Sequence, residues 1–430
     1  MKRFHFYLFL CLSVGLLAQE DVGSWVSVGN FPVVGRYDDV HIAATDEEQT
    51  TFEAWAVNRA GQVFHAPNLN EIDLWDLQFT SSQNYFRAVD FLDDGLTGFI
   101  GSLNSSFFMT EDGGENWTDI ADQLPGPETD ICGLAHRGDT VWGVGVFADP
   151  AYLIQSNDRG QNWTWTSMAD HATALVELAV SPSGELFAAG RTDTGATILR
   201  TTDGGQVWET VFANNGGIEF IWKIDFVSAD VAYATVENFG GNTTIVKSLD
   251  GGNTWTEMPV SQDYFDLQGI GFIDEQTGWV CPRNNAMLLT TDGGQTWAPD
   301  ELISNVNRIT FPPGTRQNAL ASGSLIYYFQ QAPSSTGVEP LTPILPAFGP
   351  VYPNPINGPA SVKLDLLRNT RVSIDLLDTS GRQLQSIYRG RLPAGEHSLA
   401  LGDLSQYPPG SYLLALRTSE GHQSLSLIIQ

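Results

Sequence analysis

The sequence is poor in cysteine. Of its 430 residues three are cysteine, at positions 11, 132 and 281. Cys11 lies in an apolar leader, and the other two fall in different repeats of the chain. A disulfide between them would have to cross the molecule, so two buried free thiols are the favoured interpretation. The chain is long enough to bury a core without disulfide bonds.

Basic residues are scarce over most of the chain. Residues 19–337 contain 12 Lys and Arg against 43 Asp and Glu, a net charge of −31, whereas residues 348–430 have a net charge of +1. A strongly acidic body argues against nucleic acid and against anionic membrane surfaces as partners. The excess of acidic residues is explained most simply by the solubility of an exported protein.

The common catalytic and metal-binding motifs are absent. The sequence has no GxSxG, no HExxH, no phosphate-binding loop and no Cys/His cluster. Six histidines follow the leader, without metal-ligand spacing: His41, His65, His136, His171, His397 and His422. We therefore predict no catalytic residue, no metal and no cofactor.

Long hydrophobic runs are lacking except near the start. Lys2 and Arg3 precede an apolar run at residues 6–17, and the small residue Ala18 follows it. This order is typical of a secretory signal peptide, which we place at residues 1–18. The run is too short to cross a membrane and no later stretch is longer, so we predict no transmembrane segment.

One eight-residue pattern recurs five times. It reads Ser or Thr, any residue, Asp, any residue, Gly, any two residues and Trp, as in Thr290–Trp297. Its copies contain the pairs Asp112 and Trp117, Asp158 and Trp163, Asp203 and Trp208, Asp250 and Trp255, and Asp292 and Trp297. The aspartates are 46, 45, 47 and 42 residues apart. A period in the forties with strand-like flanks predicts a radially repeated β fold.

The pattern has a local structural reason. The Asp carboxylate can accept hydrogen bonds from backbone N–H groups two residues on, and Gly supplies the positive φ of a tight turn. The hydroxyl residue can hold the incoming strand, and Trp anchors the outgoing strand. The pattern resembles the Asp-box, or BNR repeat, of sialidase-like, sortilin-type and photosystem II stability-factor-like propellers. In that family the box is a structural turn, which is the role we predict here.

The repeats predict seven blades. Six units of four short strands run from about residue 40 to 302, and the first has a degenerate sequence, Phe64–Trp75, in place of the box. Three further strands end near residue 329, without a fourth. Ser24–Gly29 contains the missing Trp, so we predict that the N-terminal strand closes the last blade and leaves no free sheet edge. The propeller is assigned to residues 19–331 and a Pro-rich linker to residues 332–350.

The last segment, residues 351–430, has short alternating strands with Gly and Pro turns, which predict a small β-sandwich. The whole segment resembles the type A C-terminal sorting domain of the type IX secretion system of Bacteroidetes. The matching stretches are Tyr352–Pro355, Asp378–Arg382, Ala394–His397, Gly410–Tyr412 and the terminal apolar strand. The resemblance implies export by the type IX machinery through residues 351–430. It also implies removal of this domain, and release or attachment at the cell surface.

Two functions remain open after these resemblances. Sialidases of the Asp-box family have an Arg-Ile-Pro motif and an arginine triad, and this sequence lacks the motif, although Arg36, Arg87, Arg283 and Arg308 could converge. Xyloglucanase-like enzymes use two facing propellers, and one is present here. The favoured function is a secreted or surface module that binds a protein or a glycan without catalysis. The alternative is a glycoside hydrolase.

A ring of aromatic and arginine residues is the predicted binding surface. In a propeller, the loops that lead into each inner strand surround the central channel, and their composition here suits protein or carbohydrate contact. The candidate ligand-binding residues are Arg36, Tyr37, Tyr85, Phe86, Arg87, Phe220, Trp222, Tyr264 and Arg308. For each aromatic taken alone, packing between blades is the stronger alternative.

Overall fold

The computed structural model describes two stretches of the chain. The first is residues 22–331, apart from 29–30, 32–35, 47–48, 70–74, 127–129, 146–150, 239–240 and 284. The second is residues 347–430, apart from 367–369, 378–382, 394 and 419–420. The predicted signal peptide and residues 332–346 of the predicted linker lie outside the described residues. In those two stretches no helix is both long and apolar enough to cross a bilayer.

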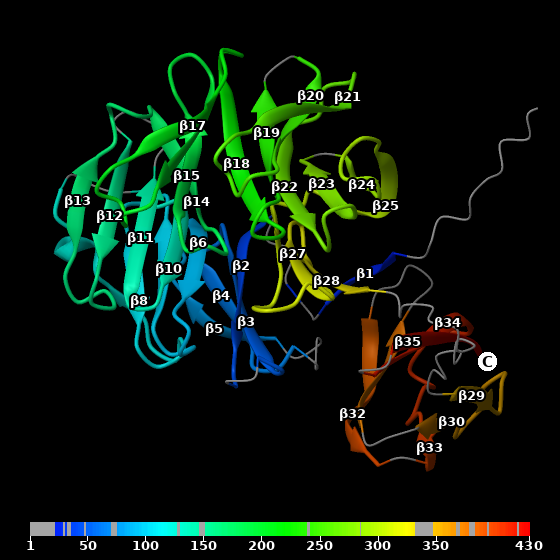
Figure 1. The fold of residues 1–430 in the computed structure, drawn as a ribbon. Coiled ribbons are helices and arrows are strands. Elements are labelled where there is room, and N and C mark those ends of the chain that lie inside the picture. Colours follow the sequence, from blue (N-terminus) through cyan, green and yellow to red (C-terminus); the bar gives the residue numbers. More distant parts are fainter. Residues whose placement is uncertain are drawn as a thin grey trace, which may run out of the picture.

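Seven four-stranded antiparallel sheets form the described part of residues 22–331 (Figure 1). Blades 1 to 3 are β2–β5 (Tyr37–Ala44, Phe52–Asn58, Gln62–Ala66, Asp76–Thr80), β6–β9 (Phe86–Phe91, Gly98–Ser102, Phe107–Thr110, Thr118–Asp119) and β10–β13 (Gly133–Arg137, Thr140–Gly145, Tyr152–Ser156, Thr164–Ser167). A short 3₁₀ turn, η1 (Ala121–Gln123), joins blades 2 and 3.

The remaining blades follow the same order of strands. Blades 4 to 6 are β14–β17 (Ala174–Val180, Leu186–Arg191, Ala196–Thr201, Glu209–Ala213), β18–β21 (Glu219–Phe226, Ala232–Asn238, Thr243–Ser248, Thr256–Ser261) and β22–β25 (Leu267–Phe272, Gly278–Pro282, Ala286–Thr290, Ala298–Ser304). Blade 7 is β26–β28 (Arg308–Thr310, Asn318–Ser322, Ile326–Gln331) with β1 (Gly23–Ser27). The first strands β2, β6, β10, β14, β18, β22 and β26 each contact the next, and β26 contacts β2. The all-β, seven-bladed prediction is confirmed.

The N-terminal strand completes the ring, as predicted. β1 pairs antiparallel with β28 (Figure 1). In this pairing Trp25 lies opposite Phe329. The Trp25 ring packs on Phe329 at 5.1 Å and on Trp279 of blade 6 at 5.4 Å between centroids. Trp25 is 4% exposed. This strand therefore seals blade 7 against blade 6 and removes the free edge that β28 would otherwise present.

Each Asp-box is a closed hydrogen-bonded turn, as the copy after β20 illustrates. The Asp250 carboxylate accepts bonds from the Thr254 N–H at 2.9 Å and from the Ser248 hydroxyl at 2.9 Å. The Ser248 hydroxyl in turn accepts the Gly252 N–H at 2.8 Å. The Trp255 indole N–H donates to the Gly252 carbonyl at 3.0 Å. These bonds satisfy the polar groups that a tight turn would otherwise leave unpaired.

One detail of the predicted turn is wrong. The carboxylate accepts from the N–H four residues on, as in Asp112 with Asn116 and Asp250 with Thr254, and not from the N–H two residues on. Consecutive glycines explain the difference, since Gly251 and Gly252 have φ of 70° and 88°. Two left-handed residues curl the chain, so the fourth N–H points back at the carboxylate.

The boxes also hold neighbouring blades together. The indole N–H of Trp55, in blade 1, donates to the Gly113 carbonyl of the blade 2 box at 3.2 Å. The Trp142 indole N–H in blade 3 and the Tyr233 hydroxyl in blade 5 likewise donate to a glycine carbonyl in the box of the following blade. Each of these aromatics lies on the second strand of its blade and is buried. A box turn therefore supports the interface between two blades.

We expect the Asp250→Ala variant to lose about 1–2 kcal/mol of unfolding free energy, because the Thr254 N–H and two hydroxyls lose their acceptor. Urea unfolding followed by far-UV circular dichroism measures the change. Asp193→Ala, at an exposed position in the loop after β15, is the control and should have the wild-type midpoint. Equal midpoints for the two variants would refute the structural role of the box.

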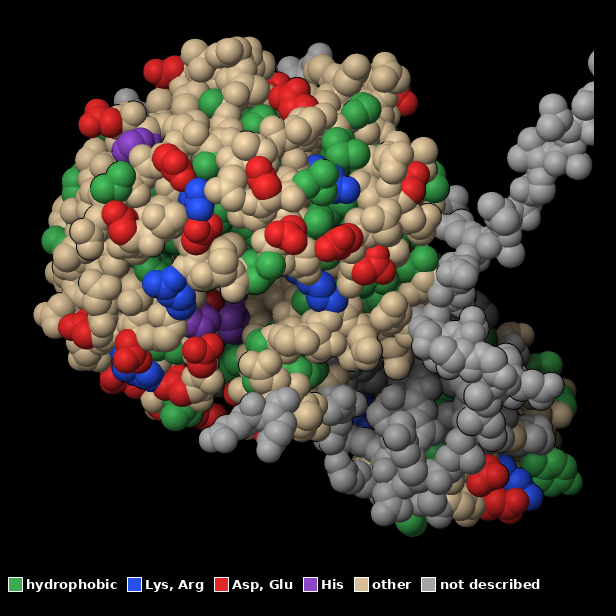
Figure 2. Space-filling model, in the orientation of Figure 1, with side chains coloured by type: hydrophobic (Ala, Val, Ile, Leu, Met, Phe, Trp, Pro, Cys, Tyr) green, Lys and Arg blue, Asp and Glu red, His purple; other side chains and the backbone are tan. Residues whose placement is uncertain are grey.

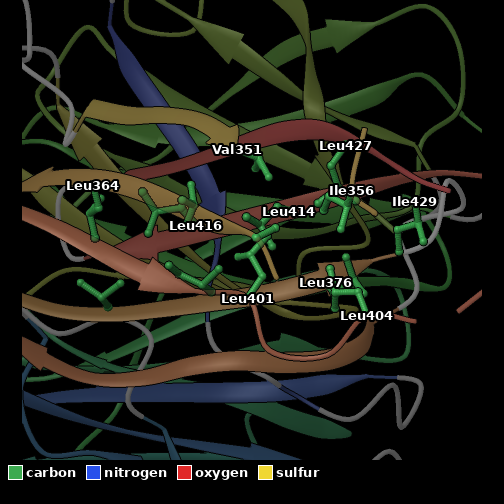
Figure 3. Packing of buried hydrophobic residues seen from close by; sticks show 14 of the residues in the cluster. Val351, Ile356, Leu364, Leu376, Leu401, Leu404, Leu414, Leu416, Leu427 and Ile429 are labelled. Carbon is green, nitrogen blue, oxygen red and sulfur yellow. The ribbon is translucent and has the colours of Figure 1, made fainter. Parts of the chain in front are cut away.

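Residues 347–430 form two further sheets. One contains β29 (Ala347–Tyr352), β30 (Ser361–Leu366) and β33 (Gly395–Ala400). The other contains β31 (Thr370–Leu377), β32 (Gln383–Leu392), β34 (Gly410–Thr418) and β35 (Gly421–Ile429). Buried side chains from both sheets, such as Leu364, Leu376 and Leu414, form one apolar cluster (Figure 3). Two sheets packed on one core are the predicted β-sandwich.

Candidate functional site

The face on which the innermost strands begin is called the start face here. Five of those strands have a bulge near this end, and the residues left unpaired by the bulges are Asp38, Arg87, Val176, Trp222 with Lys223, and Gln268. A bulge turns its extra side chain out of the normal alternation of a strand. The repeated bulges therefore direct a set of side chains into the mouth of the central channel.

Asp38 is the centre of the first cluster in this channel. Its Oδ1 accepts a bond from the Arg87 guanidinium at 2.7 Å and from the Tyr85 hydroxyl at 3.1 Å, and it forms an ion pair with Arg36. Arg36 also donates to the Gln268 side chain at 3.0 Å. Two arginines of the predicted ring thus converge on one buried carboxylate of blade 1.

Glu177 is the centre of a second cluster, deeper along the inner strands. Its Oε2 accepts from Lys223 Nζ at 2.7 Å and from Arg308 Nη2 at 2.8 Å, and Arg308 is also ion-paired with Asp39. Burial, followed by the charge of Arg308, lowers the pKa of Lys223 to about 8. Asp39, Glu177, Lys223 and Arg308 belong to blades 1, 4, 5 and 7, respectively. The cluster therefore links strands that are not neighbours in the ring.

The clusters fill the middle of the propeller. Glu177 in blade 4 and Arg308 in blade 7 lie three blades apart, the largest separation in a ring of seven. Arg87 in blade 2 and Trp222 in blade 5 have the same separation, and the guanidinium lies 5.4 Å from the indole centroid. Both contacts cross the axis of the ring. Paired side chains therefore occupy the axis at these two places, and their mutual contacts leave these side chains little freedom to bind a ligand.

A third cluster lies toward the opposite end of the inner strands. Asp90 accepts from His136 Nδ1 at 2.9 Å and lies 3.1 Å from His41 Nδ1, and His136 Nε2 lies 3.4 Å from Asp93. Although burial lowers the pKa of His136, the charges and hydrogen bonds of Asp90 and Asp93 outweigh it and raise that pKa to about 10. His136 therefore stays protonated at neutral pH and joins blades 2 and 3. No group of three or more His, Cys, Asp or Glu in the described ranges is arranged to hold a metal ion.

The structure distributes the predicted ring residues over three environments. Tyr37 and Phe86 have no exposed surface, and Phe220 is 6% exposed, so these rings pack inside or between blades. Arg36, Tyr85, Arg87, Trp222 and Arg308 belong to the polar clusters and their contacts. Tyr264 is 43% exposed and lies on the start face. The ring is therefore mostly structural in its contacts, with one aromatic free at the surface.

A pair of acidic residues lies beside Tyr264. Glu237 accepts a hydrogen bond from the Trp222 indole N–H, and Asp266 forms an ion pair with Arg283 at 3.6 Å. Burial first, then the hydrogen bond and charge of Asp266, raise the pKa of Glu237 to about 8. Glu237 therefore keeps its proton to a higher pH than an ordinary Glu side chain does.

The raised pKa of Glu237 predicts a pH dependence. An unfolded Glu titrates near pH 4.3, so the folded state binds the extra proton between about pH 4 and 8. That contribution to stability is fully present below pH 4 and is lost as the pH rises through about 8. We expect unfolding midpoints at pH 6 and pH 9 to differ less for Glu237→Gln than for the wild type. An equal difference in both proteins would contradict the raised pKa of Glu237, and Glu115→Gln serves as the surface control.

Sequence reasoning missed the acidic and basic centres of these clusters. Asp38, Asp39, Glu177 and Lys223 were not among the candidates, and neither was the neutral Gln268 beside them. A signal was present, because single charged residues interrupt otherwise apolar inner strands such as Ala174–Val180. A buried charge in a strand needs a partner of opposite sign, and here the partners come from other blades.

Two stretches of the chain match known families. Residues 350–430 match the secretion system C-terminal sorting domain, and residues 66–220 match the photosynthesis system II assembly factor YCF48. The photosystem II assembly lipoprotein Ycf48 of Synechococcus is 25% identical over 290 residues, which cover 54% of this chain and 84% of that protein.

Solved structures show the same fold. A structure of YCF48 bound to D1 peptide aligns with a TM-score of 0.52 and 17% identity, over 72% of this chain and 97% of that one. The GH74 enzyme of Niastella koreensis aligns with a TM-score of 0.53 and 13% identity, over 95% of this chain and 67% of that one. At these identities the likeness establishes architecture and not activity.

Proposed function

We propose that this chain, a YCF48-like propeller joined to a secretion system C-terminal sorting domain, is a secreted or surface-attached module that binds a protein ligand on its start face and catalyses no reaction. The assigned parts are a signal peptide at residues 1–18, the propeller at 19–331, a linker at 332–350 and the sorting domain at 351–430.

Export is supported by the C-terminal domain. Residues 350–430 match the sorting domain, which indicates secretion and an interaction with the secretion machinery. Passage through the periplasm, removal of residues 351–430 by the type IX system and final exposure on the outer cell surface are the finer proposals. The apolar core of residues 347–430 is separate from the blade cores, as expected of a removable domain.

The observation that carries a binding role is the closed centre of the ring. Among the described residues, the cations Arg87, Lys223 and Arg308 near the axis are each held by a buried carboxylate and are not free to act on a substrate. The start face exposes Tyr264 and the guanidinium of Arg283, whose side chain is 49% exposed. Tyr and Arg are the residue types that most often anchor protein interfaces. The likeness to a YCF48 structure with a bound peptide favours a protein ligand over a glycan.

The glycoside hydrolase alternative is disfavoured by the geometry of its best acidic pair. Glycosidases hold two carboxyl groups about 5 Å or more apart, so that a sugar or a water lies between them. Glu237 is only 2% exposed and accepts the Trp222 indole N–H, so it offers no open carboxylate to a sugar. Burial, followed by the nearby Asp266, explains the raised pKa of Glu237 without a catalytic role.

Peptide-library selection against the purified chain, with residues 1–18 removed, tests the proposal. Selected peptides should bind the wild type and lose about tenfold in affinity to Tyr264→Ala or Arg283→Ala. Leu249→Ala alters a side chain that is 69% exposed in a box turn on the opposite face, and it should bind as the wild type does.

A glycan array and an assay for released reducing sugar, run on the same protein, complete the test. Sugar release that is abolished in Glu237→Gln would contradict the proposal and establish a hydrolase. Glycan binding without release, together with no selected peptide, would replace the protein ligand by a glycan.

A further inference from the structure

A pocket of about 420 Å³ opens on the start face between blades 4 and 5. It is formed by the loop that leads into β18, the loop between β19 and β20, and the side of β21. The lining residues are Asn214, Asn215, Gly216, Glu219, Asn238, Asn242, Thr244 and Glu257. The volume lies within the range of small-ligand sites. None of the predicted ring residues lines it.

Two carboxylates are held side by side in this pocket. One amide, Asn214 Nδ2, donates to Glu219 Oε2 at 2.6 Å and to Glu257 Oε1 at 3.0 Å. The Asn214 side chain is itself fixed, because its Oδ1 accepts the Ala196 N–H at 2.9 Å. A Cβ at Gly216 would lie 2.1 Å from the Glu219 carboxyl carbon. A side chain at position 216 would therefore displace Glu219.

Neither carboxylate has a lysine or arginine partner among the residues that the structure describes. Glu219 is only 8% exposed, and the pocket lining contains no basic residue. Two other buried carboxylates of this propeller do have such a partner, since Asp38 is paired with Arg87 and Glu177 with Lys223. A buried carboxylate without a cation is costly, and a cationic ligand would remove that cost.

We infer that this pocket receives a lysine or arginine side chain from a basic segment of the protein ligand. The inference rests on the proposed function, since it names the group of that ligand which the start face holds. Lysine and arginine make charge-assisted hydrogen bonds with carboxylates, and the free oxygens of Glu219 and Glu257 are the acceptors available. The asparagines beside them can bond to the peptide backbone of the segment.

Other occupants fit less well. A metal ion needs oxygen ligands around it, whereas the group between the two carboxylates is the N–H donor of Asn214. A neutral sugar would leave both negative charges uncompensated. An anionic ligand would meet two carboxylates and no basic residue.

The charge of the whole propeller agrees with a basic ligand. Residues 19–337 have a net charge of −31. Figure 2 shows many Asp and Glu side chains and few Lys and Arg side chains over the visible face of the described propeller. Such a field attracts cationic ligands at a distance and weakens with added salt. Attraction of this kind is general, so the pocket must be tested by variants of equal charge.

The test uses a fluorescent hexalysine peptide and measures its binding to the chain by anisotropy at low salt. Hexalysine should bind, and its Nε-acetylated form, which is uncharged, should not. Glu219→Gln and the more exposed Glu257→Gln should each lower the affinity by about tenfold. Glu115→Gln removes the same charge from a box turn of blade 2 and should leave the affinity unchanged.

Three results would overturn the inference. Equal affinities for the Glu219, Glu257 and Glu115 variants would show attraction by overall charge alone. Equal binding of the acetylated peptide would show that the cation is unnecessary. Displacement of hexalysine by one equivalent of Ca²⁺ would identify a metal site.

The result of the hexalysine test can be distinguished from the result of the peptide-library test of the proposed function. Library peptides that depend on Tyr264 but not on Glu219 would leave the start-face function standing and remove the basic pocket. Hexalysine binding that depends on Glu219, without any library peptide that depends on Tyr264 or Arg283, would leave the cation pocket standing and remove the proposed patch of Tyr264 and Arg283.

Discussion

The Trp25→Ala variant should lose about 3–5 kcal/mol of unfolding free energy, the largest effect that we expect from a single truncation in the propeller. The Trp25 ring is 4% exposed and contacts both Phe329 of blade 7 and Trp279 of blade 6. Its removal leaves a cavity at the one place where the two ends of the propeller chain meet. Urea unfolding followed by far-UV circular dichroism measures the loss.

The matched control lies on the same strand. Ser24 is exposed beside Trp25, so Ser24→Ala should unfold at the wild-type midpoint. Proteolysis should also cut the Trp25→Ala variant first near β28, because that strand loses the cover of β1. A wild-type midpoint for Trp25→Ala would mean that β1 does not hold the ring closed.

Glu177→Gln should cost about 3–5 kcal/mol, because it removes one partner of a buried ion-pair cluster. The substitution keeps the size of the side chain but deprives Lys223 and Arg308 of the carboxylate that both contact. Two positive charges then remain buried near the axis without their common acceptor. The midpoint of urea unfolding at neutral pH is the measurement.

Glu185→Gln is the control for this effect. Glu185 belongs to the same blade and pairs with Arg200, but its side chain is 23% exposed. Such pairs contribute about 0–1 kcal/mol, so this variant should stay close to the wild type. If both variants unfold at the same urea concentration, the cluster around Glu177 does not stabilise the ring.

The sequence was sufficient for the architecture, because its strongest signals are local and periodic. The box aspartates recur every 42 to 47 residues, and each box fixes the turn between the last two strands of its blade. The closure by Ser24–Gly29 followed from counting strands, since the last unit lacked the strand that begins with Trp. The segment after residue 350 was predictable from its short alternating strands and its motif order.

The contacts inside the channel were not predictable from the sequence. Arg87 lies beside Asp38 and Trp222 only because bulges in three different blades turn these side chains inward. Bulge positions depend on the pairing of strands, which a periodic pattern does not specify. The arginines were therefore recognised as unusual, whereas the carboxylates that neutralise them were not.

The pocket between blades 4 and 5 was also missed, for a different reason. Asparagines and glycines in a loop predict a turn, and the sequence 214–217 fits that description. The carboxylate of Glu219 is brought against Asn214 by the start of β18, and Glu257 reaches the same amide from β21. Only the folded structure, in which Asn214 meets residues from the innermost and outermost strands of blade 5, reveals this acidic site.

Hydrogen–deuterium exchange of the chain, with and without its tightest library peptide, tests the central claim most directly. A ligand bound on the start face should slow exchange at residues 214–219 and 262–268, and should leave the box turns at 110–117 and 248–255 unchanged. Slower exchange confined to the box turns, or to residues 351–430, would contradict a binding role for the start face.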